Sequence, residues 1–224
     1  MEVISLHIPK TGGTSFYHIL QQVYGPALGK RYRRRDYLAA AKLPGGFEES
    51  IAADAKVLHG HFHYPEIKAL HQRTDAKLVG WLRDPIERVR SNFRFFKRGL
   101  ENPAINPQNY ERNKHRTQET LLEYASLPEC QNVMTRFATG ARLEDFFFIG
   151  LQERFTEDVH LLGKQLNWGA FTVPHENVSV PQKQPLRQAE LDLLREWNAA
   201  DIRLYLKVLE WRALPVPEIY QAFG

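Results

Sequence analysis

The hydrophobic and polar positions at the start of the chain predict a short buried strand followed by a helix. Residues 3–8 (VISLHI) form an apolar, partly β-branched run of strand length that ends at Pro9, a pattern typical of buried strands. Between residues 14 and 23 the apolar positions recur at the spacing of one helix face: Phe16, Ile19, Leu20 and Val23. Thr14 can cap the start of this helix and Gly25 can end it. The chain is therefore predicted to open as strand, glycine loop and helix.

Similar patterns predict the remaining elements. Further strands are expected at residues 57–63, 77–82 and 146–149. Further helices are expected at residues 85–98, 118–125, 131–139, 156–166, 188–198 and 200–210. Residues 102–117, which are polar and rich in Asn and Pro, are predicted to form a long mobile loop, and residues 175–185 to be irregular. The alternation of strands and helices indicates an α/β fold with three layers, in which helices flank a central parallel sheet.

The helix at residues 85–98 has well-defined ends in this prediction. Asp84 can cap it, with Pro85 in the first helical position and Glu87 completing a capping box. Gly99 can end it. Its apolar stripe consists of Ile86, Val89, Phe93 and Phe96, and its solvated face is expected to carry Arg88, Arg90 and Arg94.

The composition is that of an ordinary globular protein. Hydrophobic residues make up 43% and charged residues 25% of the 224 residues, which excludes a disordered chain and suits one domain over residues 1–224. No apolar run approaches the roughly 20 residues of a membrane helix, and the N-terminus lacks the basic region of a signal peptide. We therefore expect a cytoplasmic protein without a membrane anchor.

Cysteine content and charge narrow the possible chemistry. The single cysteine, Cys130, excludes an internal disulfide and a multi-cysteine zinc site, and its neighbours indicate a buried thiol rather than a nucleophile. The net charge of +4 suits anionic partners, which include nucleotides, acidic polysaccharides and nucleic acids. Composition does not distinguish these anionic partners, so the sequence motifs are needed.

Residues 7–15 (HIPKTGGTS) have the features of an anion-binding loop. A strand that leads through glycines into a helix directs backbone N–H groups and the positive helix end at one point. Gly12 and Gly13 permit close backbone approach, and Lys10 adds a positive charge. Lys10 precedes the glycines, whereas the Walker A lysine follows them, which argues against an ordinary ATPase or kinase. The alternative is a strand-to-helix turn in which the glycines only permit the backbone conformation and bind no anion.

Residues 82–93 (LRDPIERVRSNF) form a second candidate anion site. Arg83 is at a predicted strand end, where ligands collect in open α/β sheets. Ser91 lies two helical turns into the next element. An arginine fork together with a hydroxyl group suits a phosphate monoester.

Residues 59–63 (HGHFH) place three histidines at alternate positions. In an extended segment His59, His61 and His63 would project from one face. One interpretation is a metal site, although no second cluster of carboxylates or cysteines would complete it. Another is a general base, because imidazole has a suitable pKa near neutrality. Histidines that only pack at the strand end are the third possibility.

The two anion-binding segments resemble the cofactor motifs of sulfotransferases that use 3′-phosphoadenosine 5′-phosphosulfate (PAPS), and most closely the carbohydrate group around the heparan sulfate and uronyl 2-O-sulfotransferases. The resemblance implies a P-loop NTPase-like fold, PAPS as co-substrate and no metal. It implies that Lys10 meets the bridging oxygen of the leaving group, and that Arg83 and Ser91 hold the 3′-phosphate. The residues implied to hold the 5′-phosphate are Thr11, Gly12, Gly13, Thr14 and Ser15.

The resemblance also bears on the histidines and on the later part of the chain. Glycan 2-O-sulfotransferases carry a His-Gly-His with a catalytic histidine, which implies that His61 is the base and that His59 orients it or the acceptor. Glu66 is an alternative base. Residues 146–155 resemble the family's late strand and the turn after it. Residues 176–183 fall where these enzymes have a loop near the nucleotide, which makes candidate cofactor contacts of Asn177, Ser179 and Lys183; a plain surface loop is the alternative.

The acceptor is the least defined part of this hypothesis. The resemblance implies a hydroxyl-bearing acceptor, with a glycan expected first and a lipid, small alcohol or secondary metabolite left open. Acceptor contacts are expected from residues 32–37, from residues 102–117, and from Asn132 with Arg136. Nucleic acid is not expected as a partner. The oligomeric state is not predicted.

Two other classes of function stay open at this point. A P-loop kinase would need Mg²⁺ and ATP, and the chain lacks a clear metal-binding aspartate at a strand end. A non-catalytic binder of polyanions would bind through spread Lys and Arg with a steep dependence on salt. That interpretation leaves the lysine-glycine loop and the histidines unexplained.

Overall fold

The computed structural model describes residues 1–105, 107–174 and 185–223. The chain separates into two compact units, which are described one at a time. Unit 1 comprises Met1–Arg83 and Met134–Pro181, and unit 2 comprises Asp84–Val133 and Gln182–Gly224. That residues 1–224 form one domain stays a prediction.

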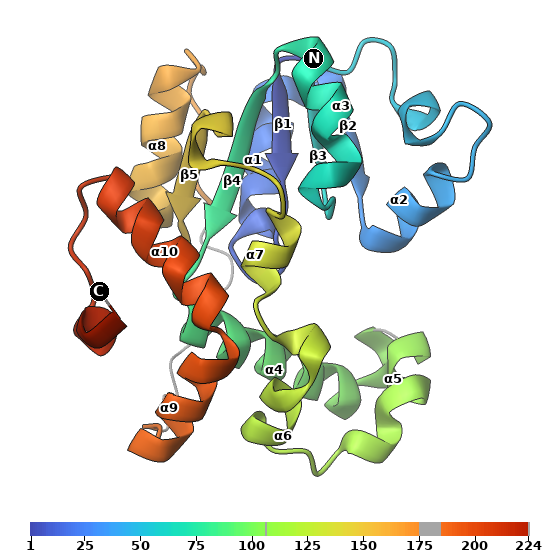
Figure 1. The fold of residues 1–224 in the computed structure, drawn as a ribbon. Helices are drawn as coiled ribbons and strands as arrows, with labels where there is room; N and C mark the ends of the chain where they lie inside the picture. The colour runs from blue at the N-terminus through green and yellow to red at the C-terminus, as the bar shows by residue number, and fades with distance from the viewer. Residues whose placement is uncertain (106, 175–184, 224) are drawn as a thin grey trace. The chain divides into compact units, whose positions relative to one another are not determined.

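Unit 1 is built around a sheet of parallel strands (Figure 1). The strands are β1 (Val3–Leu6), β2 (Leu28–Tyr32), β3 (Val57–Gly60), β4 (Lys77–Leu82) and β5 (Phe148–Leu151). Their order is β2-β3-β1-β4-β5, and every neighbouring pair is parallel. Parallel neighbours need crossover connections, which helices supply here. The predicted α/β class with a central parallel sheet is confirmed.

The two faces of the sheet are covered by different helices, because side chains alternate along a strand. On one face α1 (Gly13–Tyr24) and α8 (Phe155–Gln165) pack against the strands. The buried core on this face consists of Val3, Phe16, Ile19, Leu20, Val57, Val79, Trp81, Phe148, Val159 and Leu162. Figure 1 shows α3 (Tyr64–Thr74) over the opposite face. Burial on both faces explains why β1, β4 and β5 have nearly continuous apolar sequences.

The other helices complete the two units. Unit 1 also contains α2 (Arg34–Ala40) and nearly all of α7 (Val133–Phe137). The helices of unit 2 are α4 (Pro85–Glu101), α5 (Pro107–Asn113), α6 (Leu121–Ser126), α9 (Gln188–Trp197) and α10 (Ala199–Trp211). Short 3-10 turns occur at Gly25–Ala27, Phe47–Ser50, Pro103–Ile105, Lys114–Arg116, Pro128–Cys130, Leu143–Asp145, Gln152–Arg154 and Glu218–Phe223.

The predicted strand at residues 77–82 is confirmed at both ends. Each of the other predicted strands differs from the structure at one end or at both. β1 and β3 end before their predicted ends because the chain turns away into the loops at this edge of the sheet. β5 begins later than predicted. The strand β2 and the helices α2, α3 and α5 were not predicted. β2 (LGKRY) has no apolar run of its own, and its pairing with β3 makes it a strand.

The start of α4 agrees with the prediction and its end does not. Asp84 Oδ1 accepts a hydrogen bond from the backbone N–H of Glu87 at 2.9 Å, as expected of a cap. Gly99 does not end the helix, which continues to Glu101. Gly99 is buried inside the helix, and a Cβ there would lie at ordinary contact distance, 3.8 Å, from Asn109 Nδ2 of α5.

Arg88 is fully buried, so the prediction that it belongs to a solvated face is wrong. Its Nη2 donates to the carbonyl oxygen of Cys130 at 2.9 Å, and its Nε lies 3.9 Å from Asp201 Oδ2. The side chains of Arg88 and Asp201 are both 0% exposed, and a buried cation requires a counter-charge of this kind. Cys130 is itself buried, as predicted, and burial raises the pKa of its thiol.

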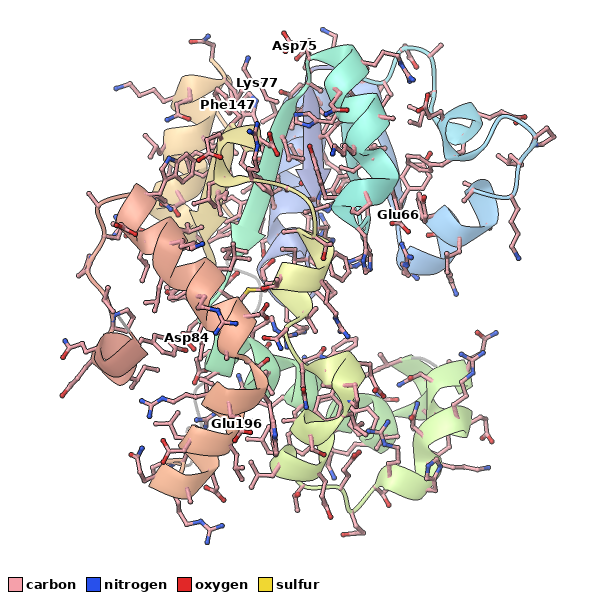
Figure 2. All side chains as sticks on the ribbon, in the orientation of Figure 1. Glu66, Asp75, Lys77, Asp84, Phe147 and Glu196 are labelled. Atoms are coloured by element: carbon pink, nitrogen blue, oxygen red, sulfur yellow. The ribbon has the colours of Figure 1, made fainter. Side chains whose placement is uncertain are left out.

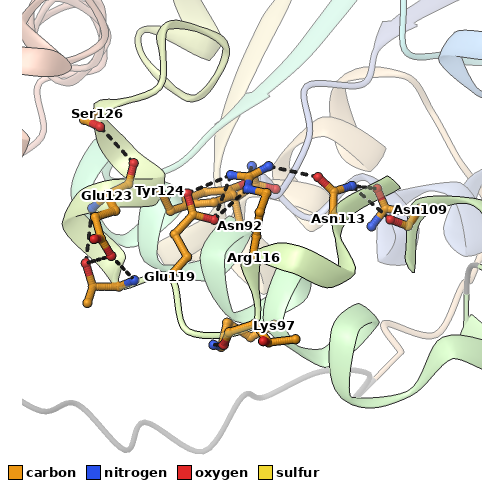
Figure 3. A network of polar contacts seen from close by, with 11 residues as sticks. Asn92, Lys97, Asn109, Asn113, Arg116, Glu119, Glu123, Tyr124 and Ser126 are labelled. Atoms are coloured by element: carbon orange, nitrogen blue, oxygen red, sulfur yellow. Dashed lines mark hydrogen bonds and ion pairs between the residues drawn. The ribbon is translucent and has the colours of Figure 1, made fainter. Parts of the chain in front are cut away.

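The prediction of a long mobile loop at residues 102–117 is wrong, since α5 and two 3-10 turns lie there. Arg116 anchors the segment (Figure 3). Its guanidinium forms two hydrogen bonds with Glu119 at 2.8 and 2.9 Å and one with Asn113 at 3.0 Å. It also lies over the ring of Phe96 at 4.6 Å. These contacts depend on α4 and are invisible in the local sequence.

A membrane-spanning helix is not found in the part of the chain that the structure describes, since no helix there is both long and apolar enough.

Replacing Phe16 by alanine should lower the free energy of unfolding by about 3–5 kcal/mol, because the ring is fully buried between α1 and the sheet. Urea denaturation measures this change. Phe95→Ala is the matched control, since Phe95 is 49% exposed, and it should cost less than about 1 kcal/mol. Equal losses in the two variants would contradict the described core.

Candidate active site

The carboxyl ends of the parallel strands gather candidate residues at one edge of the sheet in unit 1. Residues 7–12 follow β1, His61 follows β3, Arg83 follows β4 and Gln152 follows β5. β1 lies between β3 and β4 although the chain reaches β4 only after β3. The connections therefore change direction at β1, and such a switch point is where open α/β sheets bind ligands.

The loop after β1 has a strained backbone that leads directly into α1. Lys10 has φ 71° and Gly12 has φ 94°, both in the left-handed region. The Thr11 side chain is fully buried, and its hydroxyl donates to the carbonyl oxygen of Ile8 at 2.9 Å. Left-handed geometry costs a lysine roughly 1–2 kcal/mol, so the surrounding contacts must hold this conformation. Strain of this kind is common where a backbone is shaped for a ligand.

The prediction that Thr14 caps α1 is wrong, because the cap position is occupied by Gly12. Within the described part of the chain no side chain caps this helix, and its first turn contains no acidic residue. Neither a capping side chain nor an acidic residue of the first turn therefore neutralises the positive end of this helix. This is the arrangement that binds phosphate or sulfate.

Both glycines of the loop are required by their surroundings. A Cβ on Gly12 would lie 2.2 Å from Gln152 Oε1, and a Cβ on Gly13 would lie 1.9 Å from His7 Cδ2. Gly12 also needs its positive φ. The glycines thus allow the loop to pack against Gln152 and His7, and Gly12 also permits the left-handed backbone.

Arg83 contacts the same loop from the end of β4. Its Nη1 donates to the carbonyl oxygen of Lys10 at 3.4 Å. Its Nε is buried and has no hydrogen-bond partner among residues 1–105, 107–174 and 185–223. The sequence-predicted Lys10 and Arg83 are therefore brought together. Ser91 is a buried residue of α4 and belongs to unit 2.

The histidines form a stack that continues the pairing of β1 with β3. Ser5 is paired with His59, and Leu6 with Gly60, so the next residues in register are His7 and His61. The His7 ring stacks on His59 at 4.9 Å and on His61 at 4.0 Å between ring centroids. His59 is fully buried, and its Nδ1 is 2.8 Å from Ser5 Oγ. An acceptor molecule therefore cannot reach His59 directly.

His61 is half-buried and has a defined tautomer. Its Nδ1 lies 2.8 Å from the carbonyl oxygen of His7. A carbonyl oxygen only accepts hydrogen bonds, so Nδ1 carries the proton and the neutral ring keeps a lone pair on Nε2. A ring in this state can accept a proton.

His63 does not continue the row of histidines, because β3 ends at Gly60 and His63 occupies the cap position of α3. Glu66, labelled at the start of α3 in Figure 2, accepts hydrogen bonds from the His63 N–H at 2.8 Å and from Arg34 Nη1 at 2.6 Å. The His63 ring stacks on Phe137 at 4.4 Å. Burial lowers the pKa of His63, the charges of Arg34 and Arg136 lower it further, and Glu66 raises it.

A metal centre is not found among the described residues, where no three His, Cys, Asp or Glu side chains are grouped to hold an ion. The predicted cofactor contacts Asn177, Ser179 and Lys183 lie outside the described residues.

Asn132, predicted to contact an acceptor, has a structural role in unit 2. Its Oδ1 accepts from the N–H groups of Ala200 and Asp201 at 2.9 and 3.2 Å. Its Nδ2 donates to the carbonyl oxygen of Trp197 at 3.0 Å. The side chain thus connects α9 to the start of α10. Arg136, its predicted companion, is exposed on α7 in unit 1.

Sequence reasoning missed two residues of this site, His7 and Gln152. Each directly follows a strand, at Leu6 and Leu151, so the position after a strand end is the signal that could have identified them. Both were counted as parts of a motif and were given no role. Only the parallel pairing brings them beside His61 and Gly12.

Comparison with known proteins reveals a similar fold without a similar sequence. No protein-family model matches the chain, and no curated protein matches it. A sulfotransferase from Alicyclobacillus acidocaldarius is similar over 99% of this chain and 99% of its own, with a TM-score of 0.54 and 15% identity. Mouse sulfotransferase SULT7A1, solved in complex with PAP, is similar over 87% of this chain and 62% of its own, with a TM-score of 0.47 and 11% identity. The first similarity supports the fold, and the second is too low to support an argument.

Replacing Gly13 by alanine should destabilise the protein by about 1–3 kcal/mol, because the new methyl group would meet the His7 ring. Thermal and urea denaturation measure this loss. Gly169→Ala is the control, since a Cβ at Gly169 would have no described atom within 4 Å, and it should change stability by less than about 0.5 kcal/mol. A neutral Gly13→Ala variant would contradict the packing of His7 under the loop.

The lowered pKa of His63 predicts a dependence of stability on pH. The folded state favours the neutral ring of His63. Its contribution to the free energy of unfolding is therefore fully present above pH 6.5, the ordinary pKa of histidine, and is lost as the pH drops below that value. His63→Gln should flatten this fall when urea denaturation is compared between pH 7.5 and about pH 5. An unchanged slope in His63→Gln would refute the assignment.

Proposed function

We propose that this protein is a sulfotransferase that moves a sulfuryl group from PAPS to a hydroxyl group of an acceptor, with a glycan as the preferred class. The observation that carries the proposal is the loop after β1, which leads into an uncapped helix at the edge of the sheet where His61 and Arg83 also lie. An anion site and a proton acceptor are thus combined at a switch point of an α/β sheet. The fold that this chain shares with the A. acidocaldarius sulfotransferase is compatible with the proposal.

The loop fits the 5′-phosphosulfate end of PAPS. The uncapped N-terminus of α1 offers backbone donors, and both glycines keep side chains away from the bound anion. We assign this end to Lys10, Thr11, Gly12, Gly13, Thr14 and Ser15. Because the Thr11 hydroxyl already donates to Ile8, this residue can contribute only its backbone N–H.

The 3′-phosphate is assigned to Arg83 and Ser91, as the resemblance implies. The buried Nε of Arg83, which lacks a partner in the described part of the chain, supports an anion there. The hydrogen bond from Nη1 to the carbonyl of Lys10 links the two ends of the nucleotide site through one side chain. Asn177, Ser179 and Lys183 remain proposed contacts of the nucleotide.

When bound, PAPS supplies a sulfuryl group whose bond to the phosphate oxygen breaks as a bond to the acceptor oxygen forms, leaving PAP. His61 accepts the proton of the acceptor hydroxyl on Nε2, and Lys10 neutralises charge on the departing oxygen. The amides at the start of α1 stabilise the negative oxygens. Positioning and charge neutralisation therefore provide most of the catalysis, as in phosphoryl transfer.

His61 is a better candidate for the base than the other groups considered. His59 is fully buried and is assigned a supporting role beneath His7. Glu66 accepts hydrogen bonds from the His63 N–H at the start of α3 and from Arg34, and both are structural contacts. His61 combines partial exposure with an unprotonated Nε2.

A Mg²⁺-dependent kinase is the second candidate, and nucleotide binding separates it from the proposal. Calorimetric titration of the full chain should detect binding of PAP without metal and in preference to ATP with Mg²⁺. Arg83→Ala should weaken PAP binding about 10- to 100-fold, because a hydrogen bond to a charged group contributes roughly 1.5–3 kcal/mol. Arg73→Ala is the control, since Arg73 pairs with Glu48 near the end of α3, and it should bind PAP like the wild type.

Absence of PAP binding, or a preference for Mg²⁺–ATP, would overturn the cofactor assignment. If PAP binds, His61→Asn should retain its affinity and reduce sulfuryl transfer from PAPS to screened hydroxyl acceptors about 10²- to 10⁴-fold, the usual contribution of a general base. A fully active His61→Asn variant would assign the base elsewhere.

A further inference from the structure

His7 is the residue through which the anion-binding loop and the proton acceptor touch one another. It is 6% exposed and is the first residue after β1. Its backbone N–H donates to the carbonyl oxygen of Gly60 at 2.8 Å, which extends the pairing of β1 with β3 by one step. This step puts His7 opposite His61, so their juxtaposition follows from the register of the sheet.

The His7 ring contacts the loop on one side. The ring atoms Cδ2 and Nε2 lie 1.9 and 2.0 Å from the position that a Cβ on Gly13 would occupy. Gly13 is the first residue of α1, where the proposed 5′-phosphate binds. The His7 ring therefore packs directly against the backbone of the loop at Gly13, and only a glycine at this position leaves room for the ring.

The same ring is enclosed between two other imidazoles. The His61 ring is 4.0 Å away with an angle of 25° between the planes, and the His59 ring is 4.9 Å away with an angle of 28°. His59 is fully buried, and Ser5 Oγ contacts its Nδ1 at 2.8 Å. His59, at one end of the stack, is thus held in place by its burial and by Ser5 of β1.

His7 contacts His61 in a second way, through its main chain. The carbonyl oxygen of His7 accepts the hydrogen bond from Nδ1 of His61 at 2.8 Å. One residue therefore provides both a flat surface for the His61 ring and the acceptor that fixes its tautomer. An imidazole without such constraints rotates and exchanges its proton between the two nitrogens.

We propose that His7 is a positioning residue for the proposed transfer reaction: its ring holds His61 in the plane in which Nδ1–H meets the His7 carbonyl, so that Nε2 stays unprotonated. This inference rests on the proposed function for its role in catalysis, while its geometry can be tested without it. The ring of Phe137 also lies near His61, at 6.4 Å between ring centroids, and the His63 ring stacks on Phe137.

Two substitutions separate the ring of His7 from its carbonyl. His7→Ala keeps the carbonyl and removes the stacking surface. His7→Phe keeps a flat ring of similar size and removes the imidazole nitrogens. His18→Ala, in the middle of α1, is the control for the loss of a histidine elsewhere.

The experiment is long-range ¹H–¹⁵N NMR of the histidine rings in the full chain, which distinguishes Nδ1–H from Nε2–H directly. Wild type, His18→Ala and His7→Phe should show His61 with the proton on Nδ1. His7→Ala should show a mixture of both tautomers. Titration of each sample with PAP then reports separately on the nucleotide site.

Either of two results would overturn the inference: a wild-type His61 with its proton on Nε2, or a His61 in His7→Ala that keeps the wild-type tautomer. The first result needs no variant, so it is decisive even if His7→Ala fails to fold. Loss of PAP binding in every sample, with the expected tautomers, would instead overturn the proposed function and leave the role of His7 in orienting His61 intact.

Discussion

The parallel pairing of β1 with β3 and β4 is the constraint on which the site depends. In register, Ser5 is opposite both His59 and Val79, so the chain segments that follow the three strands leave the sheet at one edge. The loop of Lys10, the ring of His61 and the guanidinium of Arg83 come from these three segments. A shift of β1 against β3 by one residue would turn His7 to the face opposite His59 and His61, and the stack would be lost.

The strained loop shows how the sheet and α1 stabilise a conformation that the local sequence disfavours. Lys10 adopts a left-handed φ, and its carbonyl oxygen accepts a hydrogen bond from Arg83. Gly12 and Gly13 leave space that Gln152 and His7 fill. The loop is therefore held by the residues that directly follow β1, β4 and β5. Contacts of this kind restrict the loop, which lowers the cost of ordering it on binding.

Unit 2 is organised around a buried charge. Arg88 of α4 donates to the carbonyl of Cys130 and lies beside Asp201 of α10, and the side chains of Arg88 and Asp201 are fully buried. Removing one partner of such a pair is costly, because the other is left buried without compensation. Asn132 and Arg116 add further connections between segments that are distant in sequence. Unit 2 thus combines these polar contacts with an apolar cluster formed by Phe96, Leu100, Tyr124 and Cys130.

The sequence by itself determined the class of the fold and the glycine loop of the candidate site. Buried parallel strands need continuous apolar runs, so β1 and β4 were recognisable, and the glycine loop between β1 and α1 was recognisable from its composition. Asp84 as a cap was also predictable, because capping is a local interaction.

Only the tertiary structure decided which side chains meet. β2 becomes a strand by pairing with β3, Arg88 is buried beside Asp201 of α10, and Arg116 packs over Phe96 of α4. The selection of His7 as the neighbour of His61 likewise depends on strand register, which joins residues 54 positions apart. Periodicity describes which face of an element is apolar, and it contains no information on which element covers that face. The distinction between the half-buried His61, the fully buried His59 and the capping His63 therefore required the fold.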